Sequence, residues 1–372
     1  MPIKTPKIAI VHDWLTTMGG AEKTILALHE AFPEAPIYTS VYEPETMPDF
    51  AGLTIRTTWL QKFPKAFRKL HKFFPILRVW AFRSLNLSEF DILVVSSSAE
   101  SKQIKKLPHQ TIICYCHTPI RYYWSHYAEY KKDPGFGSLN WLVRLAMPLV
   151  VPLLKKADYK AAQQVDVFIA NSSEVQARIK KYYDRTATIV YPPVEVDRFT
   201  AQALNKQRQG FVIVGRQVPY KRFDLAVAVC TKLKLPLAVY GNGGEHERLK
   251  KMAGPTITFH ANAPDTEIAK ALGRAEAFIF PAEEDFGIVQ AEALAAGTPV
   301  IAINKGGSRE IIQDGETGIL FNEQTVASLA EGIARFQKTT FLPATLHRKS
   351  KRFHRTLFIS KIQKIVAGYA KK

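Results

Sequence analysis

The chain has 372 residues and carries 51 Lys and Arg against 33 Asp and Glu, a formal net charge of +18. This length suits two domains of ordinary size, and a hydrophobic fraction of 47% excludes an intrinsically disordered chain. The excess of positive charge points to an anionic partner. The three cysteines, Cys114, Cys116 and Cys230, have no metal-ligand spacing, so we expect reduced, structural thiols.

The N-terminal segment and the longest apolar stretch predict neither a secretory signal nor a membrane span. The segment MPIKTPKIAIVHDWL places lysines before a short strand-like run and lacks the apolar region of a signal peptide. The stretch WLVRLAMPLVVPLLKKA is interrupted by Arg144, Pro148 and Pro152, so it falls short of a spanning helix. We therefore expect a cytoplasmic protein.

Apolar runs typical of buried strands recur along the first half of the chain. The candidates are KIAIV, PIYTSV, DILVVSS, TIICYC, DVFIAN and TIVYPP, with helical stretches between several of them. This alternation predicts an α/β fold with a doubly wound parallel sheet. We assign these runs to an N-terminal domain over residues 1–193.

Two of these strands are followed by residues suited to a ligand. Gly19 and Gly20 stand between KIAIVHDWL and the helical run TILALHEAF, where backbone without side chains can approach a ligand. The strand TIICYC ends at His117, and Arg121 follows shortly after. The structural alternatives are a plain turn for the glycines and a satisfied interior or loop histidine for His117.

Basic and aromatic side chains alternate between residues 51 and 88, where no acidic residue occurs. This composition suits the surface of an anionic membrane, because cations meet the headgroups and aromatic rings lie among them. The alternative is an ordinary helical hairpin with buried rings and solvated lysines. The predicted membrane residues are Trp59, Lys62, Phe63, Lys65, Phe67, Arg68, Lys69, Lys72, Phe73, Phe74, Arg78 and Trp80.

The chain turns polar after residue 193, and the stretch VEVDRFTAQALNKQRQG, residues 194–210, predicts an interdomain linker. A second series of strand-like runs follows, namely GFVIVG, PLAVYG, TITFHA, AFIFPA, PVIAIN and TGILF. This series predicts a second Rossmann-like domain over residues 211–355. Apolar residues at helical spacing in the basic C-terminal segment predict a last helix over residues 356–372.

Glycine and cationic residues follow the first two strands of this second series. Gly215 and Arg216 end the run FVIVGR, and Lys221 lies near the start of the next helix. Two cations held there could neutralise a diphosphate, although solvated surface charge is the alternative. Gly241 follows the run PLAVY, where a nucleotide could approach the backbone.

The segment PAEEDFGIVQAEALAAGTPVIA, residues 281–302, is the most informative. AFIF before it predicts a buried strand, residues 285–287 a turn, and residues 288–296 a helix ended by Gly297. Glu284 then lies just before the turn and Glu292 within the helix. Ligands bind open α/β sheets at this edge, where helix N-terminal amides favour an anion and Glu284 could reach neutral hydroxyls. The alternative is a helix-capping acid and a solvated glutamate.

Taken together, these motifs resemble the family 4 retaining glycosyltransferases, which have the GT-B fold of two Rossmann-like domains facing across a cleft. The glycine loop, the histidine after TIICYC, the Arg216 and Lys221 pair, and two glutamates separated by seven residues occur in the family's order over residues 7–321. The resemblance implies retaining hexosyl transfer from a nucleotide sugar, and a last helix that crosses back to the first domain. The segments EEDFG and HTPIRYYW are similar to those of bacterial mannosyltransferases, which favours GDP-mannose as the donor.

The resemblance also implies roles for individual residues. In the catalytic group, two cations neutralise the leaving diphosphate, a histidine steadies the sugar or its phosphate, and a glutamate holds sugar hydroxyls: Arg216, Lys221, His117 and Glu284. The remaining donor-binding residues are Gly19, Gly20, Arg121, Gly215, Gly241, Asp285, Phe286, Gly287, Ile288, Val289 and Glu292. Asp285 departs from the family, since many members have glycine there. No metal is expected, because the chain lacks an Asp-x-Asp signature of metal-dependent transferases.

Several alternatives remain open from the sequence. The donor could be a UDP-sugar, an epimerase or phosphorylase could use the same fold, and the net charge fits a non-enzymatic protein that binds anionic polymers. A nucleic acid partner is not expected, because no nucleic-acid-binding motif is recognised. The expected partners are the nucleotide sugar, a glycan or lipid-linked acceptor, and the anionic inner face of the cell membrane. The oligomeric state is left open.

Overall fold

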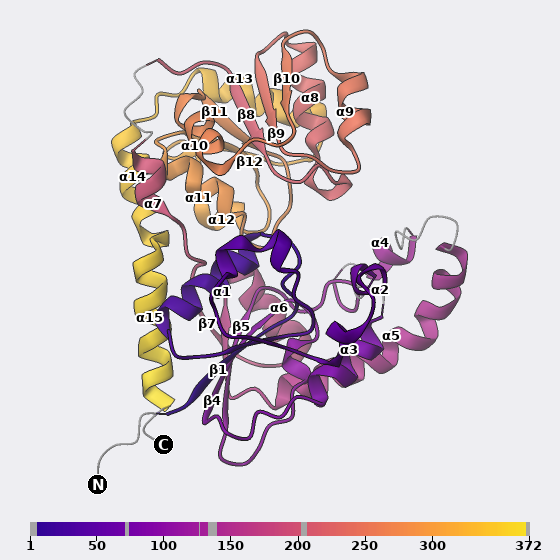
Figure 1. Cartoon of the computed structure of the whole chain (residues 1–372). Coiled ribbons are helices and arrows are strands. Elements are labelled where there is room, and N and C mark those ends of the chain that lie inside the picture. The colour runs from indigo at the N-terminus through magenta and orange to yellow at the C-terminus, as the bar shows by residue number, and fades with distance from the viewer. Residues whose placement is uncertain (1–5, 71–73, 126, 133–139, 202–206, 370–372) are drawn as a thin grey trace. The chain divides into compact units, whose positions relative to one another are not determined.

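A computed structural model of the chain describes residues 6–70, 74–125, 127–132, 140–201 and 207–369. The chain divides into two compact units (Figure 1). The first unit comprises Met1–Tyr191 and Phe358–Lys372, and the second comprises Pro192–Leu357. Each unit is built on its own parallel sheet, which confirms the predicted α/β architecture.

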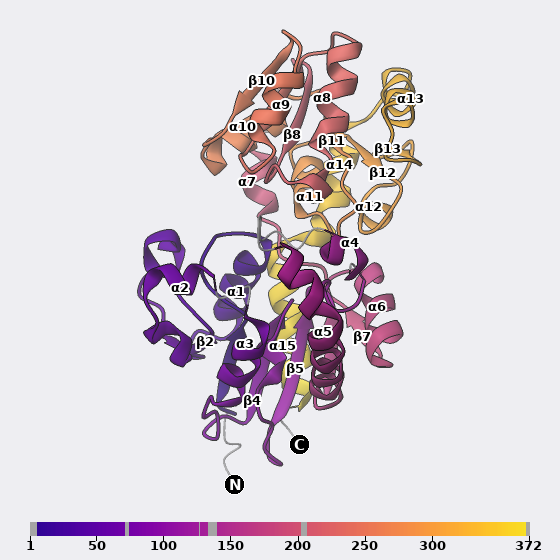
Figure 2. The ribbon, with the colours of Figure 1, turned by 90° about the vertical axis from the view of Figure 1, so that its right-hand side faces the viewer.

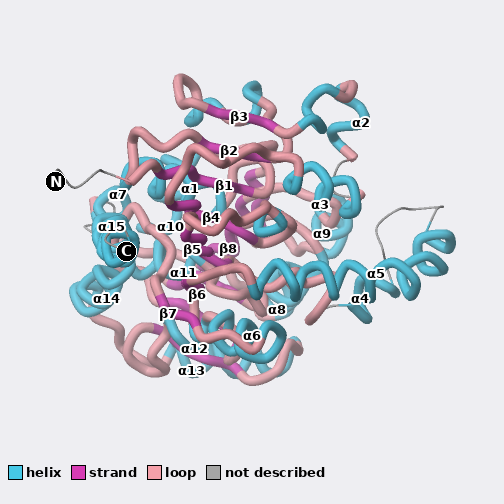
Figure 3. Tube along the Cα trace, turned by 90° about the horizontal axis from the view of Figure 1, so that it is seen from below, coloured by secondary structure: helices cyan, strands magenta, loops and turns pink. Residues whose placement is uncertain are grey.

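In the described part of the first unit, seven strands form a parallel sheet in the order β3-β2-β1-β4-β5-β6-β7 (Figure 3). Both faces of the sheet are covered by helices, so its central strands are continuous apolar runs. The order reverses between β1 and β4, and this switch point is where ligands of such sheets bind. The strands are β1 (Ile8–His12), β2 (Ile37–Thr39), β3 (Ile55–Thr57), β4 (Ile92–Ser97), β5 (Thr111–Cys116), β6 (Val167–Ala170) and β7 (Ala187–Ile189).

The helices of the first unit bury apolar residues on both faces of this sheet. One core contains Phe82, Leu93 and Phe168, and the other contains Ile10 and Ile113. Cys114, Cys116 and Cys230 are buried and free of disulfide bonds, which agrees with a structural role. The helices are α1 (Gly20–Ala31), α2 (Lys65–Lys69), α3 (Pro75–Arg83), α4 (Tyr127–Lys132), α5 (Asn140–Gln163) and α6 (Ser173–Tyr183).

In the second unit the described residues form a six-stranded parallel sheet in the order β10-β9-β8-β11-β12-β13 (Figure 2). Its order reverses between β8 and β11, which are hydrogen-bonded neighbours. The strands are β8 (Phe211–Val214), β9 (Leu237–Tyr240), β10 (Ile257–His260), β11 (Ala277–Phe280), β12 (Val300–Ile303) and β13 (Gly318–Phe321). The helices are α8 (Phe223–Lys232), α9 (His246–Met252), α10 (Asp265–Arg274), α11 (Ile288–Ala295), α12 (Ser308–Ile311), α13 (Val326–Gln337) and α14 (Pro343–Ser350).

Of the predicted linker, residues 194–210, the structure describes residues 194–201 and 207–210, and the prediction for residues 202–206 lies outside the described residues. Its first part forms a short helix, α7 (Val196–Thr200), whose Val196 and Phe199 side chains are buried. At its end, the Arg208 guanidinium donates to the carbonyl of Ala296 at 3.0 Å. The described residues of this stretch therefore belong to the second unit, and the two buried side chains, spaced by three positions, lie on one face of α7.

The last helix, α15 (Arg355–Tyr369), joins the core of the first unit from Phe358 onward (Figure 1). Phe358, Ile362 and Val366 are buried and lie four positions apart, so they share one face of the helix. The Phe358 ring meets the Tyr115 ring edge-on, with centroids 5.4 Å apart. The helix thus returns to the N-terminal unit after the chain has formed the whole second unit.

Candidate active site

The switch point of the second unit brings together two charged side chains from adjacent strands. Lys221 belongs to the loop after β8, and Glu284 belongs to the loop after β11. Their Nζ and Oε1 atoms are 2.9 Å apart, and each side chain is 19% exposed. Two residues far apart in the sequence therefore meet where an open α/β sheet binds its ligand.

This ion pair keeps Lys221 charged. Burial disfavours the ammonium form, but the carboxylate of Glu284 outweighs it, so the pKa of Lys221 is raised. Arg216, a second cation on the same loop, has a smaller effect that lowers the pKa of Lys221. Arg216 itself is exposed. The loop after β8 thus presents two positive charges at the sheet edge.

The Glu284 carboxylate makes few interactions apart from the ion pair with Lys221. Within the part of the chain that the structure describes, its Oε1 atom is buried and has no hydrogen-bond partner beyond the ion pair with Lys221. A buried carboxylate oxygen normally accepts hydrogen bonds, because desolvation without them is costly. Glu284 therefore has free acceptor capacity for a ligand that brings donors.

Two glycines outside the predicted site residues pack closely against the backbone around Glu284. The Gly307 amide donates to the Glu284 carbonyl at 2.9 Å. A Cβ atom at Gly306 would lie 2.3 Å from that carbonyl oxygen, and one at Gly307 would lie 2.4 Å from the Phe286 Cα atom. The signal in the sequence was the Gly-Gly pair shortly after the strand run PVIAIN, which resembles the other strand-end glycines.

Gly215 and Gly241 are explained by packing between loops. Gly241 has φ +110°, and a Cβ atom there would lie 2.1 Å from the Gly215 carbonyl oxygen. A Cβ atom at Gly215 would lie 3.2 Å from Lys221 Nζ. Both glycines therefore support the loop that carries Lys221.

The turn and helix after β11 agree with the sequence prediction. Strand β11 covers the run AFIF, and α11 covers residues 288–295. Gly287 has φ +85°, which favours glycine, and the amides of Ile288 and Val289 begin the helix at the sheet edge. The first turn of α11 carries no acidic residue, so the positive end of the helix dipole is free to favour an anion.

Three further residues of this segment are buried. The Phe286 ring packs edge-on against Phe353 with centroids 5.5 Å apart, so its side chain belongs to the core. Asp285 is 9% exposed and Glu292, on α11, is 8% exposed. The structure thus places Asp285, Phe286 and Glu292 on the same loop and helix as Glu284.

In the first unit, His117 follows β5 and stands at the end of the central strands. Its Nε2 atom is 2.8 Å from Ser96 Oγ, and the Asn171 side chain donates to its carbonyl at 3.0 Å. These contacts fix the ring and the backbone beside the end of β4. Arg121, four residues later, is half-buried.

Gly19 and Gly20 begin helix α1 directly after the loop that follows β1. Gly19 has extended backbone with φ −162°, which any residue adopts. A Cβ atom at Gly19 would lie 3.0 Å from Glu22 Oε2, so a side chain there would displace this carboxylate. The glycine therefore leaves room for Glu22 to fold back on the start of the helix.

A buried carboxylate at the end of β1, not selected from the sequence, ties the first switch point together. Asp13 accepts hydrogen bonds from the amides of Ser98 at 2.7 Å, Ala99 at 2.9 Å and Ser101 at 2.8 Å. Burial raises the pKa of Asp13, but the neighbouring His12 and these amides outweigh it, so the pKa is lowered. The signal was a charged residue placed directly after a buried strand.

His12 is likewise buried and paired. Its Nε2 atom lies 3.7 Å from Glu22 Oε1, and its Nδ1 atom lies 3.2 Å from the Ser96 carbonyl. Burial lowers the pKa of His12, but Glu22 outweighs this effect, so the pKa is raised. The loops after β1 and β4 are thus joined by a charged network.

Two residues predicted for a membrane surface are held inside the first unit, and that prediction is wrong for them. Arg78 is 1% exposed, and its Nε donates to Glu100 at 2.7 Å. Arg68 donates from Nε to Glu43 at 2.7 Å and is also largely buried. Both guanidinium groups are paired with carboxylates from outside the basic segment, so neither is available to lipid headgroups.

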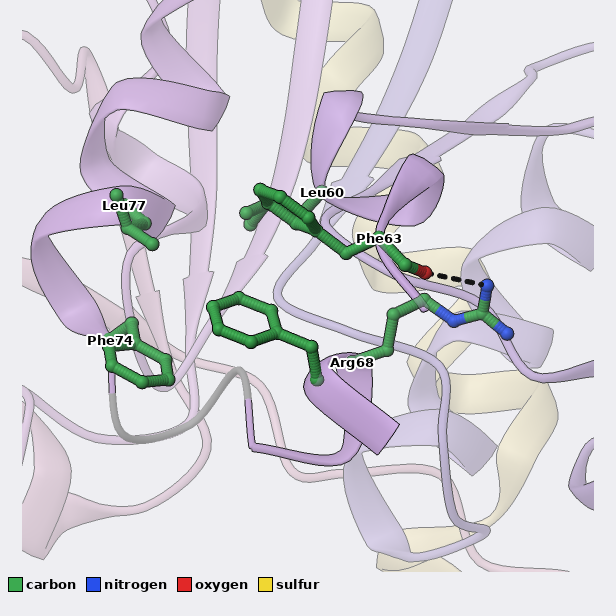
Figure 4. Close-up of a pocket in the computed structure, with 6 residues that line it drawn as sticks. Leu60, Phe63, Arg68, Phe74 and Leu77 are labelled. Carbon is green, nitrogen blue, oxygen red and sulfur yellow. Dashed lines mark hydrogen bonds between the residues drawn. The ribbon is translucent and has the colours of Figure 1, made fainter. Parts of the chain in front are cut away.

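Several aromatic residues of that segment pack against each other. The rings of Phe67 and Phe74 are stacked with centroids 5.1 Å apart, and Trp59 meets Phe63 edge-on at 5.8 Å. A small, mainly apolar pocket with a cavity volume of about 10 Å³ lies beside the Phe63, Phe67 and Phe74 rings (Figure 4). It is lined by Leu60, Phe63, Phe67, Arg68, Phe74 and Leu77.

The rest of the predicted membrane set is partly exposed. Lys62 and Lys65 are exposed, and Lys65 pairs with Glu45 at 2.5 Å. Trp80 is 59% exposed. Lys72, Phe73 and the side chain of Lys69 lie outside the described residues, so the prediction for them is not tested.

The described residues contain neither a cluster of metal ligands nor a membrane-spanning helix. Over the described ranges, no three His, Cys, Asp or Glu side chains gather as metal ligands. In the same ranges, none of the helices combines the length and the apolar composition needed to cross a bilayer.

Two Rossmann-like units, each built on its own parallel sheet, are the architecture of the GT-B fold. A sequence model described as Glycosyltransferase Family 4 matches residues 18–198, and one described as Glycosyl transferases group 1 matches residues 196–353. The two matches together cover both units. The chain belongs to the family 4 glycosyltransferases.

Curated relatives include mannosyltransferases. The GDP-mannose-dependent alpha-(1-6)-phosphatidylinositol monomannoside mannosyltransferase of Mycobacterium tuberculosis is 27% identical, over 50% of this chain and 56% of that protein. The alpha-1,3/1,6-mannosyltransferase of Rhizomucor pusillus is 24% identical, over 90% of this chain and 85% of that protein. The match to the mycobacterial relative thus spans about half of its length.

Solved structures share the fold at low sequence identity. Sucrose-phosphate synthase from Thermosynechococcus elongatus has a TM-score of 0.70 and 18% identity, with 98% of each chain covered. Anabaena HepE, solved with UDP and glucose, has a TM-score of 0.67 and 16% identity, with 97% of this chain and 99% of that chain covered. These likenesses concern the fold alone.

Proposed function

We propose that this glycosyltransferase moves mannose from GDP-mannose to a saccharide or lipid-linked acceptor, with retention of anomeric configuration and without a metal ion. The observation that carries the proposal is the Lys221–Glu284 pair at the switch point of the second unit. A cation and an under-bonded carboxylate side by side suit a donor that combines a diphosphate with neutral hydroxyls.

In this proposal the two cations of the β8 loop stabilise the leaving group. Arg216 and Lys221 neutralise the charge that develops on the nucleoside diphosphate as the glycosidic bond breaks. The amides at the start of α11 add hydrogen-bond donors to the same anion. This arrangement replaces the divalent metal that other transferases use to balance the phosphate charge.

Glu284 binds the sugar part of the donor. When the diphosphate binds Lys221, it competes with Glu284 for the ammonium group, and the carboxylate becomes free to accept hydrogen bonds from sugar hydroxyls. Glu292 holds the nucleotide ribose, and His117 of the first unit steadies the sugar or its phosphate. The acceptor oxygen bonds to the anomeric carbon on the face from which the diphosphate departs, and its proton passes to the leaving phosphate. Attack on this face retains the anomeric configuration.

Mannose as the transferred sugar is supported by the similarity to mannosyltransferases and by the EEDFG and HTPIRYYW segments. The mycobacterial relative is GDP-mannose-dependent, and the fungal one is a mannosyltransferase. A UDP-sugar is the second candidate donor, favoured by the solved complex of Anabaena HepE with UDP and glucose. The acceptor lies at the cytoplasmic face of the membrane in both cases.

The test is thermal unfolding of the full chain with GDP, UDP, ADP and their sugars, since a ligand that binds only the native state raises the midpoint. We expect GDP and GDP-mannose to give the largest shifts, and nucleotide release with acceptor extracts to persist in excess chelator. Larger shifts of the unfolding midpoint with UDP and its sugars would indicate that the donor is a UDP-sugar and not GDP-mannose. Loss of all turnover with chelator would refute the metal-independent mechanism, and sugar release or phosphate-dependent cleavage without acceptor would favour an epimerase or a phosphorylase.

A further inference from the structure

Helix α5 carries a stripe of large apolar side chains that nothing in the described chain covers. Trp141, Leu145, Leu149 and Leu153 are 64%, 67%, 74% and 71% exposed. They are spaced by four positions, so they follow one side of the helix over a length of about 18 Å. Exposed apolar stripes of this size mark interaction surfaces in soluble folds.

The stripe is separate from the face of α5 that belongs to the core. Val151 and Leu154 of the same helix are buried and pack with Val79, Ile120 and Tyr123. The C-terminal half of α5 is therefore anchored to the first unit, while its N-terminal half extends away from the sheet (Figures 1 and 3). Helix α5 is thus apolar on two sides, and only one of them is used by the fold.

The charged residues of α5 indicate which kind of surface the apolar stripe would contact. The only acidic residue of α5 is Asp158, which is buried and pairs with Lys102 at 2.6 Å. Arg144, Lys156 and Lys160 are exposed basic residues of the same helix. A second copy of this chain would bring like charges face to face, whereas an anionic surface would be attracted.

We propose that α5 lies in the interface of an anionic lipid bilayer, with its apolar stripe among the acyl chains and its basic residues at the headgroups. Helix α5 does not meet the length and hydropathy needed to span a membrane. A helix with one apolar side and basic residues nearby suits a position along the membrane surface. Trp80 of α3, within the segment that the sequence predicts to contact a membrane, is also exposed. The inference is independent of sugar transfer, because binding is measured without donor.

The experiment is sedimentation of the full chain with vesicles of phosphatidylglycerol and phosphatidylcholine, or of phosphatidylcholine alone. The double variant Leu149→Ser/Leu153→Ser removes the two most exposed leucines of the stripe and no core contact. The matched control is Leu342→Ser, an exposed leucine of the second unit. We expect the double variant to lower partition into anionic vesicles about tenfold or more, and the control to leave it unchanged.

Two further readouts make the proposal refutable. Brominated lipids should quench part of the tryptophan fluorescence, and Trp141→Phe should remove that part. Equal binding of wild type and double variant to anionic vesicles would overturn the proposal. So would a vesicle-free dimer, seen by light scattering, that the same two substitutions dissociate, because a second copy would then be the partner. Continued nucleotide binding in either case would leave the proposed function standing.

Discussion

Replacing Glu284 by Gln separates the charge of this residue from its shape. At an effective dielectric constant of 20, two unit charges 2.9 Å apart attract by roughly 6 kcal/mol, and desolvation of the two groups offsets most of this. Both side chains are about a fifth exposed. We therefore expect Glu284→Gln to lower the free energy of unfolding by only about 1–2 kcal/mol, which leaves the fold intact.

We expect Glu284→Gln to affect the two parts of the donor in opposite directions: binding of the nucleotide is kept or strengthened, and use of the sugar is weakened. With the carboxylate gone, Lys221 is free for phosphate, so GDP should bind the variant as well as, or more tightly than, wild type. Sugar hydroxyls lose a charged acceptor, so kcat/KM for GDP-mannose should fall about a hundredfold, equivalent to about 2.7 kcal/mol.

The assays are calorimetric titration with GDP and steady-state release of GDP from GDP-mannose. The matched control is Glu283→Gln, because Glu283 is the adjacent, exposed glutamate and lies 3.9 Å from Lys305. That variant should behave like wild type in both assays. Wild-type turnover by Glu284→Gln, or a tenfold loss of GDP affinity in it, would refute the role of the pair.

The pH dependence of this ion pair follows from the raised pKa of Lys221. A lysine with a raised pKa contributes stability that is present below its ordinary value of 10.5 and is lost as the pH rises through the folded value. The difference in unfolding free energy between wild type and Glu284→Gln should thus stay constant from pH 7 to pH 9 and shrink at more alkaline pH.

Three other predictions concern the fold around the sites. Arg78→Gln leaves the buried Glu100 carboxylate without its cation, so denaturant unfolding should show a loss of about 3–5 kcal/mol. Gly307→Ala places a Cβ atom against the backbone of the loop after β11, so GDP-mannose turnover should fall and stability should drop by about 1–3 kcal/mol; unchanged values would contradict the tight contact. Because the pKa of His12 is raised above 6.5 by Glu22, its contribution to stability is present below pH 6.5 and lost as pH rises, and Glu22→Gln should flatten this part of the thermal-unfolding profile.

The sequence predicted the sheets better than their edges. Each predicted strand run forms a strand, because buried parallel strands are continuous apolar segments. Strand β3 was not predicted: its three residues, Ile55–Thr57, are half-exposed at the sheet edge and form no apolar run. Helix α7 was taken for a linker, because five residues with two buried side chains give too little periodicity.

The sequence predicted the charged residues of the candidate site, but not the residues that hold the surrounding loops in place. Lys221 and Glu284 stand after strands that pair in the sheet, so their meeting could be expected from the topology. Gly307 and Asp13 each follow a strand run but were not selected, because their contacts are with loops that only the folded chain brings near. Arg78 was misjudged for the same reason, since its partner Glu100 lies outside the basic segment.

The central claim is that Lys221 stabilises the departing diphosphate of the sugar donor. Its most direct test is the rate of GDP release from GDP-mannose, with an acceptor present, by wild type and by folded Lys221→Ala. We expect Lys221→Ala to lower kcat at least a hundredfold, because the charge that Lys221 balances develops as the glycosidic bond breaks. A folded Lys221→Ala variant with wild-type kcat would contradict it.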